Sequence, residues 1–171
     1  LFPYTTLFRS QAEQLGTAHA VAQSREALAG AGGDVLVLYG DTPFVRPETL
    51  EAMREARARH AVVVLGFEAA DPGRYGRLVM IGDMLERIVE FKDASPAEQA
   101  IRLCNSGVIC ADAAMLFDLV AAVGNRNASG EYYLTDIVEI ARARGLSVGM
   151  VRCDESETLG INTRAELAAA E

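Results

Sequence analysis

The sequence has 171 residues, of which 50% are hydrophobic and 23% are charged, an ordinary composition for one domain with a sizeable core. The formal net charge of −8 argues against a nucleic-acid surface, because phosphate backbones select proteins rich in Lys and Arg. A single nucleoside triphosphate stays compatible with this charge, since it needs only a local group of donors or a metal ion. No stretch approaches the roughly 18 apolar residues of a membrane helix, so we expect no membrane contact.

The first ten residues, LFPYTTLFRS, differ from the rest of the chain. They lack the basic start, the continuous apolar stretch and the small-residue cleavage site of a signal peptide. They resemble the translation of a sequencing-adapter oligonucleotide, so residues 1–10 are expected to be a non-native scar. Residues 11–171 are then expected to form one partial domain.

From Asp34 onward the pattern alternates strands with helices. The β-prone apolar runs at 35–39 and 61–67 predict two strands buried on both faces, with a charged helix from about Pro47 to His60 between them. Pro47 suits the first turn of a helix, and Glu48 suits the positive end of the helix dipole.

The middle of the chain predicts a β-hairpin, with strands at 77–81 and 85–91 around Gly82-Asp83, and then one helical turn at 95–98. Later elements are expected as a strand at 104–110, helices at 112–123 and 133–144, a strand at 147–152 and a final Ala-rich helix. This alternation predicts an α/β layer fold with a mainly parallel sheet and an antiparallel insert at one edge.

The three cysteines are Cys104, Cys110 and Cys153, and no two of them form a C-x-x-C pair. If Cys104 and Cys110 share a strand, six residues at roughly 3.3 Å each hold them about 20 Å apart. We therefore predict reduced, mostly buried thiols and a cytoplasmic protein.

Ligands of open α/β sheets bind beyond the carboxyl ends of the strands, and Asp41 lies just past the first strand. A lone carboxylate there, after Gly40, suits a hard divalent cation that keeps several waters. The alternative is a simple turn capped by Asp41. Gly16 and Thr17 can present amides and a hydroxyl to a base edge, or can form an ordinary helix N-cap.

Polar residues also follow the hairpin. Glu90 can accept hydrogen bonds from sugar hydroxyls and Lys92 can neutralise a phosphate, although a solvated, salt-bridged edge has the same composition. A buried Asn105 demands partners, either in the backbone or in a ligand. The polar residues of 130–136 can bind a polar ligand or can cap and pack, and Asn162 is ordinary unless a metal lies opposite.

Seven segments, in this order, resemble the bacterial N-acetylglucosamine-1-phosphate uridyltransferases and span nearly everything after residue 10. The combination of Gly-Glu-Tyr-Tyr-x-Thr-Asp with Gln-Leu-Gly-Thr is the most specific part of the resemblance. The segments are QAEQLGTAHA at 11–20, LYGDTP at 38–43, YGR at 75–77, IVEFKDA at 88–94, NSG at 105–107, GEYYLTD at 130–136 and GIN at 160–162.

The resemblance implies a Rossmann-like nucleotidyltransferase fold of three layers, similar to the GT-A fold. It implies a Mg²⁺-dependent transfer of UMP from UTP to N-acetylglucosamine-1-phosphate, which gives UDP-N-acetylglucosamine and pyrophosphate. The attacking phosphate is already ionised, so no general base is needed and catalysis consists of positioning and charge stabilisation.

The resemblance also assigns residues to the two substrates and the metal. Gln11, Gly16 and Thr17 would contact the uracil, and Asp41 and Asn162 would hold Mg²⁺. The sugar, its N-acetyl group and its ribose-side neighbours would be contacted by Gly76, Glu90, Asn105, Tyr133 and Thr135.

The Gly-rich phosphate loop of the family precedes the matched region. One preorganised donor to the transition state is worth about 10²–10³ in rate, so the 171-residue chain without this loop is expected to be nearly inactive. Loss of the strand next to the loop also opens an edge of the sheet, so marginal stability is expected. The family often continues into a β-helical acetyltransferase domain, through which a homo-oligomer would form. Two alternatives stay open: a sibling sugar-1-phosphate nucleotidyltransferase for another base or sugar, and a non-catalytic module.

Overall fold

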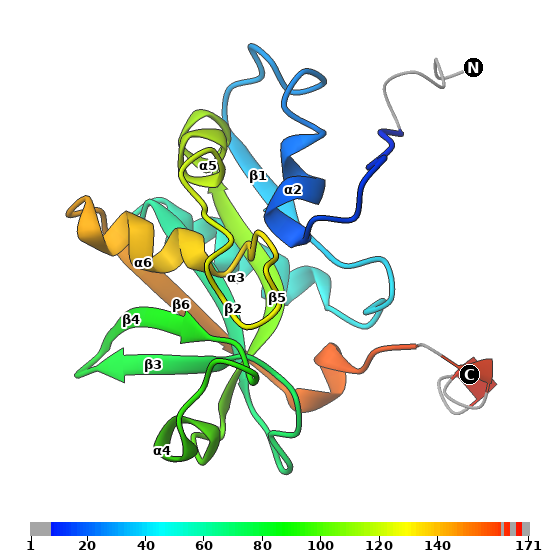
Figure 1. Cartoon of the computed structure of the whole chain (residues 1–171), viewed down its shortest axis with the longest axis vertical. Helices are drawn as coiled ribbons and strands as arrows, with labels where there is room; N and C mark the ends of the chain where they lie inside the picture. The colour runs from blue at the N-terminus through cyan, green and yellow to red at the C-terminus, as the bar shows by residue number, and fades with distance from the viewer. Residues whose placement is uncertain (1–7, 162, 165–166, 169–171) are drawn as a thin grey trace.

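The computed structural model describes residues 8–161, 163–164 and 167–168. It contains a six-stranded sheet in the order β4-β3-β5-β2-β6, with β1 paired to the C-terminal half of β5 (Figure 1). The strands are β1 (Asp34–Val37), β2 (Val62–Glu68), β3 (Arg77–Ile81), β4 (Met84–Val89), β5 (Leu103–Asp112) and β6 (Val148–Cys153). The helices are α2 (Thr17–Ala22), α3 (Pro47–Arg57), α4 (Pro96–Gln99), α5 (Ala113–Val120) and α6 (Asp136–Ala143), and Glu155–Thr158 form the 3₁₀ helix η1.

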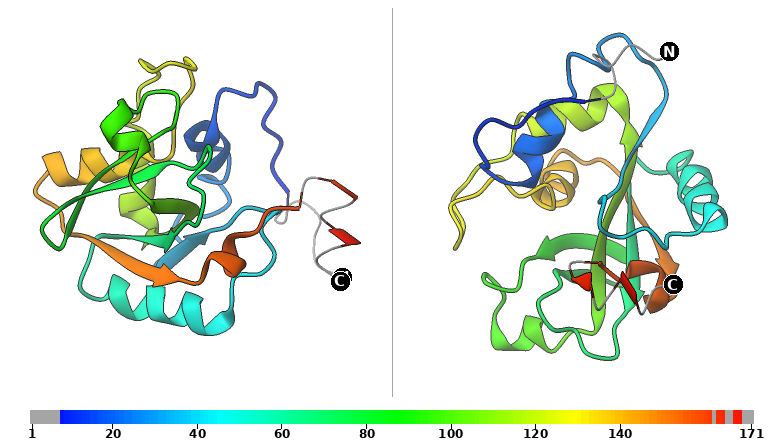
Figure 2. Two further views of the ribbon diagram at one scale, coloured as in Figure 1. Left: turned by 90° about the horizontal axis from the view of Figure 1, so that it is seen from below. Right: turned by 90° about the vertical axis from the view of Figure 1, so that its right-hand side faces the viewer.

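Helices cover both faces of the sheet, so the three-layer α/β architecture is confirmed. Helix α3 packs on one face against β2, β5 and β6, and α2, α5 and α6 lie on the other face (Figure 2). Strand β2 serves both layers, because Val62 and Val64 join the larger hydrophobic cluster while Val63 and Leu65 pack with Met53 of α3. This double burial explains the unbroken apolar run of β2.

The sheet is mixed, whereas the sequence pattern predicts a mainly parallel one. Strands β2 and β6 pair in parallel, but β5 runs antiparallel to β1, β2 and β3. The cause is the hairpin of β3 and β4, which reverses the chain at Gly82 with a φ of 59°. Strand β5 follows in the reversed direction, and the chain turns back only through α5 and α6.

Strand β1 is not buried on both faces, which corrects the prediction for residues 35–39. Val35 and Val37 pack against the larger hydrophobic cluster, but Leu36 is 36% exposed and Leu38 is 45% exposed. Alternate residues of a strand point to opposite faces, so only one face of β1 is covered by the described part of the chain.

Strand β5 carries a bulge opposite the middle of β2. Ile109 pairs with Val64 and Asn105 pairs with Gly66, so β5 uses two more residues than β2 over this interval. The Ser106 hydroxyl donates to the Leu65 carbonyl at 2.8 Å and accepts from the Val108 N–H at 3.2 Å, replacing part of the ladder. Bulges bend a strand, and beyond this bend β5 leaves β1 and pairs with β3.

Most of the other predicted elements are confirmed. Helix α3 begins at Pro47 and α4 has a complete capping box of Ser95 and Glu98. Helix α6 begins at Asp136, later than the predicted residue 133, because residues 133–135 form a turn beside the site described below. The 3₁₀ helix η1 was not predicted, and the final Ala-rich helix lies largely outside the described residues.

All three cysteines are free, as predicted, with Cys104 and Cys110 buried in the same strand. Within the part of the chain that the structure describes, no helix is long and apolar enough to cross a membrane.

Asp112 joins β5 to α5, because its carboxylate accepts a hydrogen bond from the Met115 N–H at 3.1 Å. We expect Asp112→Ala to lower the free energy of unfolding by about 0.5–2 kcal/mol, since one N–H of the first turn loses its acceptor. The control is Asp118→Ala in the same helix, where an exposed carboxylate makes one ion pair of 3.7 Å with Arg25. Urea unfolding should show a loss within about 0.5 kcal/mol for the control, and equal losses would contradict the capping role.

Candidate active site

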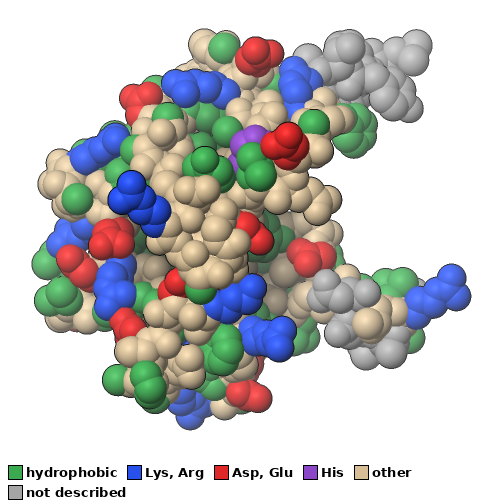
Figure 3. Space-filling model, viewed as in Figure 1, with side chains coloured by type: hydrophobic (Ala, Val, Ile, Leu, Met, Phe, Trp, Pro, Cys, Tyr) green, Lys and Arg blue, Asp and Glu red, His purple; other side chains and the backbone are tan. Residues whose placement is uncertain are grey.

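A cavity of about 530 Å³, called here the central cavity, lies where β1, β4 and β6 lead into loops and where β5 begins. Figure 3 shows that this face is hollowed on its right-hand side, between the end of the molecule that carries the N-terminus and the part that carries the C-terminus in Figure 1. Four residues singled out from the sequence line the central cavity together, namely Asp41, Gly76, Glu90 and Asn105. Lining residues to which the sequence assigned no role include Tyr39, Ser106 and Thr158.

Asn105 is held in the cavity wall by backbone contacts. It is only 8% exposed, its N–H donates to the Gly76 carbonyl at 2.8 Å, and its Oδ1 accepts from the Gly107 N–H at 3.1 Å. The side-chain NH₂ donates to none of the described residues. The fold therefore fixes the carboxamide of Asn105 and leaves its two N–H donors beside the cavity.

Glu90 joins the end of β4 to the turn before α6. Its Oε1 accepts a hydrogen bond from the Thr135 hydroxyl at 3.0 Å. Burial raises the pKa of Glu90, the Thr135 hydrogen bond opposes this shift, and the nearby charge of Asp93 adds to it. A desolvated carboxylate needs donors, so the remaining lone pairs of Glu90 suit the hydroxyls of a bound ligand.

Tyr39 fills the gap that the bulge of β5 leaves. Gly107 has a φ of 89°, and a Cβ at this position would meet three atoms of the Tyr39 ring at under 3.0 Å. Burial raises the pKa of Tyr39, the charges of Glu90 and Asp41 raise it further, and a hydrogen bond with Thr17 opposes the shift. Tyr39 thus connects the strand that carries Asp41 to the bulge and to α2.

The residues predicted to contact uracil lie together at the start of α2, outside the lining of the central cavity. Gln11 Nε2 donates to the Gly16 carbonyl at 3.0 Å, and the Thr17 hydroxyl accepts from the Leu134 N–H at 2.9 Å. Gly16 has a φ of 116°, and a Cβ there would meet the Tyr132 backbone at under 3.0 Å. This close approach docks the segment on residues 132–134 and places it next to Tyr39.

Asp41 lies at the rim of the central cavity as an exposed carboxylate. Its carbonyl accepts from the Ile161 N–H at 2.8 Å, and its carboxylate makes no hydrogen bond or ion pair with the described part of the chain. Asn162, the second predicted metal ligand, lies outside the described residues. No group of three His, Cys, Asp or Glu side chains that could hold a metal occurs among the described residues. A single carboxylate fits Mg²⁺, which keeps several waters and shares its coordination with substrate phosphates.

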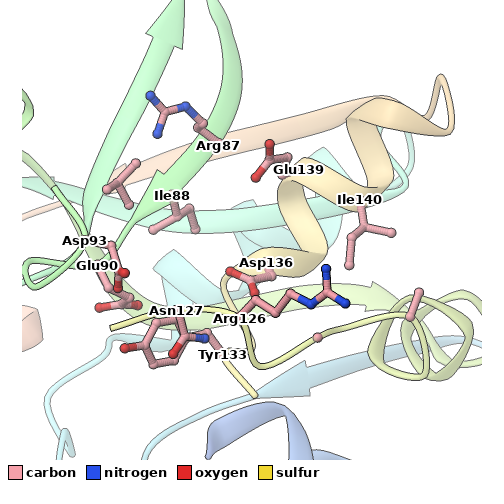
Figure 4. A pocket seen from close by; sticks show the side chains of 13 residues that line it. Arg87, Ile88, Glu90, Asp93, Arg126, Asn127, Tyr133, Asp136, Glu139 and Ile140 are labelled. Carbon is pink, nitrogen blue, oxygen red and sulfur yellow. The ribbon is translucent and has the colours of Figure 1, made fainter. Parts of the chain in front are cut away.

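Tyr133 lines a neighbouring cavity of about 400 Å³, called here the lateral cavity, which shares Glu90 with the central cavity (Figure 4). Asp136 lies in its wall. Burial is the main cause that raises the pKa of Asp136 to about 6, and the charges of Glu139, Glu90 and Asp93 add to the shift. Arg87 and Arg126 line the same cavity.

Lys92, which the sequence suggested as a phosphate contact, does not line the central cavity. Its Nζ donates to the Ser129 hydroxyl at 3.0 Å, and it lines a third cavity with Tyr133. The structure therefore brings Thr135 to the central cavity through Glu90, while Tyr133 and Lys92 face the adjoining spaces.

Gly107→Ala should displace Tyr39, because the added methyl group and the positive φ are both unfavourable. We expect it to lower the free energy of unfolding by about 1–3 kcal/mol in urea denaturation. In a Tyr39→Ala background the loss should shrink, since the ring that clashes is gone. The control is Gly124→Ala, which meets no atom within 4 Å and has no positive φ. Equal effects of the two substitutions would contradict the packing of Tyr39 on Gly107.

Asp136 should make the stability of the fold depend on pH. Its pKa is raised from 3.8 to about 6, so the folded state holds the proton more tightly than the unfolded state. Stability therefore falls as the pH rises through this interval, and the penalty is complete above it. We expect Asp136→Asn to be more stable than the parent at pH 7, with a difference that shrinks as the pH falls and vanishes below the unfolded pKa of 3.8. A difference that is constant between these pH values would contradict the shifted pKa.

The chain is similar to known proteins in sequence and in fold. The sequence model of the nucleotidyl transferase family matches residues 2–155. The chain is 73% identical over 161 residues to the bifunctional protein GlmU of Cereibacter sphaeroides and 68% identical over 161 residues to that of Ruegeria pomeroyi, and each match covers 94% of this chain and 36% of the relative. The chain thus spans about a third of the length of these relatives.

A solved structure shows the same fold. The nucleoside-diphosphate-sugar pyrophosphorylase of Vibrio cholerae RC9 superimposes with a TM-score of 0.68 at 16% identity, over 94% of this chain and 66% of that one. Since the family model covers most of the chain, the resemblance found in the motifs is confirmed, and the chain belongs to the nucleotidyl transferase family.

Proposed function

We propose that the central cavity binds the sugar of N-acetylglucosamine-1-phosphate in an enzyme that transfers UMP to it from UTP. The observation that carries this proposal is the meeting of Asp41, Gly76, Glu90 and Asn105 in one cavity. These residues are far apart in the sequence, and each belongs to a different segment of the resemblance. Relatives named as bifunctional GlmU proteins support the same reading.

On the sugar side, the free lone pairs of Glu90 would accept from hydroxyls, and the NH₂ of Asn105 would donate to a carbonyl or hydroxyl oxygen. Gly76 leaves the space for this approach. A Cβ there would lie 3.3 Å from Ile88 Cγ2 and 3.4 Å from Glu90 Oε2, and would crowd the carboxylate. Thr135 would orient Glu90 through their hydrogen bond, and Tyr133 would reach the sugar only from the adjoining cavities.

On the nucleotide side, Gln11, Gly16 and Thr17 would contact the uracil at the start of α2. The Thr17 side chain lies close enough to Tyr39 to affect its pKa, so this segment adjoins the wall of the central cavity. We infer that Tyr39 separates the base from the sugar and holds both segments at a fixed spacing.

The reaction would begin with attack of a phosphate oxygen of the sugar phosphate on the α-phosphorus of UTP. A new bond forms from that oxygen to the α-phosphorus, and the bond to the bridging oxygen breaks, so that pyrophosphate leaves. The nucleophile is already ionised, so the chain supplies orientation and exclusion of water instead of a base. Asp41, together with Asn162, would hold Mg²⁺, which neutralises phosphate charge when it is bound.

The free thiols fit a reducing compartment, so the cytoplasm is part of the proposal. Two other readings are outcomes of the test: a sibling enzyme with another base or sugar, and a module without activity.

The test uses a fusion in which residues 11–171 follow the segment of the Cereibacter sphaeroides relative that precedes its matched region. This fusion supplies the phosphate loop that the resemblance places there. Pyrophosphate release is measured with Mg²⁺ across a panel of nucleoside triphosphates and hexose-1-phosphates. Release only with UTP and N-acetylglucosamine-1-phosphate supports the proposal, and another pair moves the specificity to a sibling enzyme. No release from a folded fusion refutes the enzymatic function.

In the same fusion, Asp41→Ala should reduce Mg²⁺-dependent turnover by about 10²-fold or more, because the cavity loses its rim carboxylate. The control is Asp83→Ala, at the exposed turn of the hairpin and away from the cavity lining. Steady-state kinetics at several Mg²⁺ concentrations should separate the two variants. Unchanged turnover in Asp41→Ala would exclude this residue as a metal ligand.

A further inference from the structure

One buried carboxylate is not used by the proposed substrate contacts. Glu157 in η1 is 4% exposed and is the only buried acidic side chain among the described residues. Its Oε2 accepts from the Arg46 N–H at 3.0 Å and from the Thr49 hydroxyl at 2.7 Å. Both partners belong to the start of α3, more than 100 positions earlier in the chain.

Glu157 binds the start of α3 from a distant segment of the chain. The residue at the N-cap position, Arg46, gives no side-chain cap to the helix. The Glu157 carboxylate satisfies the N–H of this N-cap residue and lies at the positive end of the helix dipole. Burial alone raises the pKa of Glu157, but the hydrogen bonds from Arg46 and Thr49 outweigh it, so the pKa is lowered and the group stays charged.

The contact is one of two hydrogen-bonded contacts, called here the two ties, between the segment after β1 and the segment after β6. Residues 41–46 lead from Asp41 to α3, and residues 157–161 lead from Glu157 along the wall of the central cavity. At the far end, the Ile161 N–H donates to the Asp41 carbonyl at 2.8 Å. The two segments are therefore bonded at both ends, with Thr158 and Gly160 facing the cavity between the ties.

We propose that Glu157 is a positioning residue that fixes the segment after β6 against α3, and thereby holds Ile161 against the backbone of Asp41. The role in metal binding rests on the proposed function, because it concerns the Mg²⁺ that Asp41 would hold. The coupling of the two ties stands on the geometry alone. A purely stabilising contact would lower overall stability without coupling the ties or changing the metal requirement.

The first experiment measures amide hydrogen exchange in the 171-residue chain itself, without the fusion. In Glu157→Gln the weakened contact should reduce protection of the Arg46 amide and, through the coupling, of the Ile161 amide. The matched control is Glu155→Gln in the same 3₁₀ helix, whose carboxylate accepts from the Ala70 N–H at 3.2 Å. The control should lose protection at Ala70 and leave Ile161 unchanged. Unchanged protection of Ile161 in Glu157→Gln would overturn the proposal.

The second experiment uses the fusion. In Glu157→Gln the Mg²⁺ concentration for half-maximal turnover should rise about 10-fold or more, while the KM for the sugar phosphate stays near that of the parent. Binding of Mn²⁺ with UDP-N-acetylglucosamine, followed by electron paramagnetic resonance, should weaken by a similar factor. Lower turnover with an unchanged Mg²⁺ requirement and unchanged Mn²⁺ binding would contradict the role in metal binding.

Thr49 supplies a second variant if Glu157→Gln does not fold. Thr49→Val removes one donor to the carboxylate and should shift the Mg²⁺ requirement in the same direction by a smaller factor, whereas Thr49→Ser keeps the hydroxyl and should behave as the parent. An equal requirement in Thr49→Val and Thr49→Ser would count against the proposal. A parent fusion without Mg²⁺-dependent transfer would refute the proposed function instead, and hydrogen exchange would still decide the coupling of the ties.

Discussion

The bulge at Ser106–Val108 interrupts β5 and lets a single strand serve two neighbours on the same side, first β3 and then β1. The Ser106 hydroxyl replaces part of the lost ladder, and Gly107 adopts a φ that favours glycine. Because β1 and β3 do not meet beside the bulge, a space opens between their ends. Tyr39 fills part of it, and the rest forms the central cavity.

Much of the fold follows from local patterns. The apolar run of β2, Pro47 at the start of α3 and the turn at Gly82 each act within a few residues, so the sequence predicts them well. Strand direction and the exposure of Leu36 depend instead on which strands become neighbours. No periodicity along the chain reports on that choice, and these were the points where the pattern misled.

The residues of the site also fall into two groups, those that local sequence patterns reveal and those that they do not. Asp41, Glu90 and Asn105 stood out because a strand end or a hairpin places polar groups where ligands bind, and they do meet in one cavity. Tyr39 and Glu157 did not stand out, since their roles depend on Gly107 and on Arg46, each far away in the sequence. The signal for Tyr39 was a glycine inside a strand, which indicates a close approach without naming the partner.

We propose that the sugar binds in the central cavity, between β5 and the loops after β1, β4 and β6. A crystal structure of the fusion with UDP-N-acetylglucosamine and Mg²⁺ would locate the sugar. We expect sugar hydroxyls within hydrogen-bond distance of Glu90, the N-acetyl group near Asn105, and the uracil beside Gly16 and Thr17. A sugar bound in the lateral cavity against Asp136, with the central cavity filled by water, would contradict it.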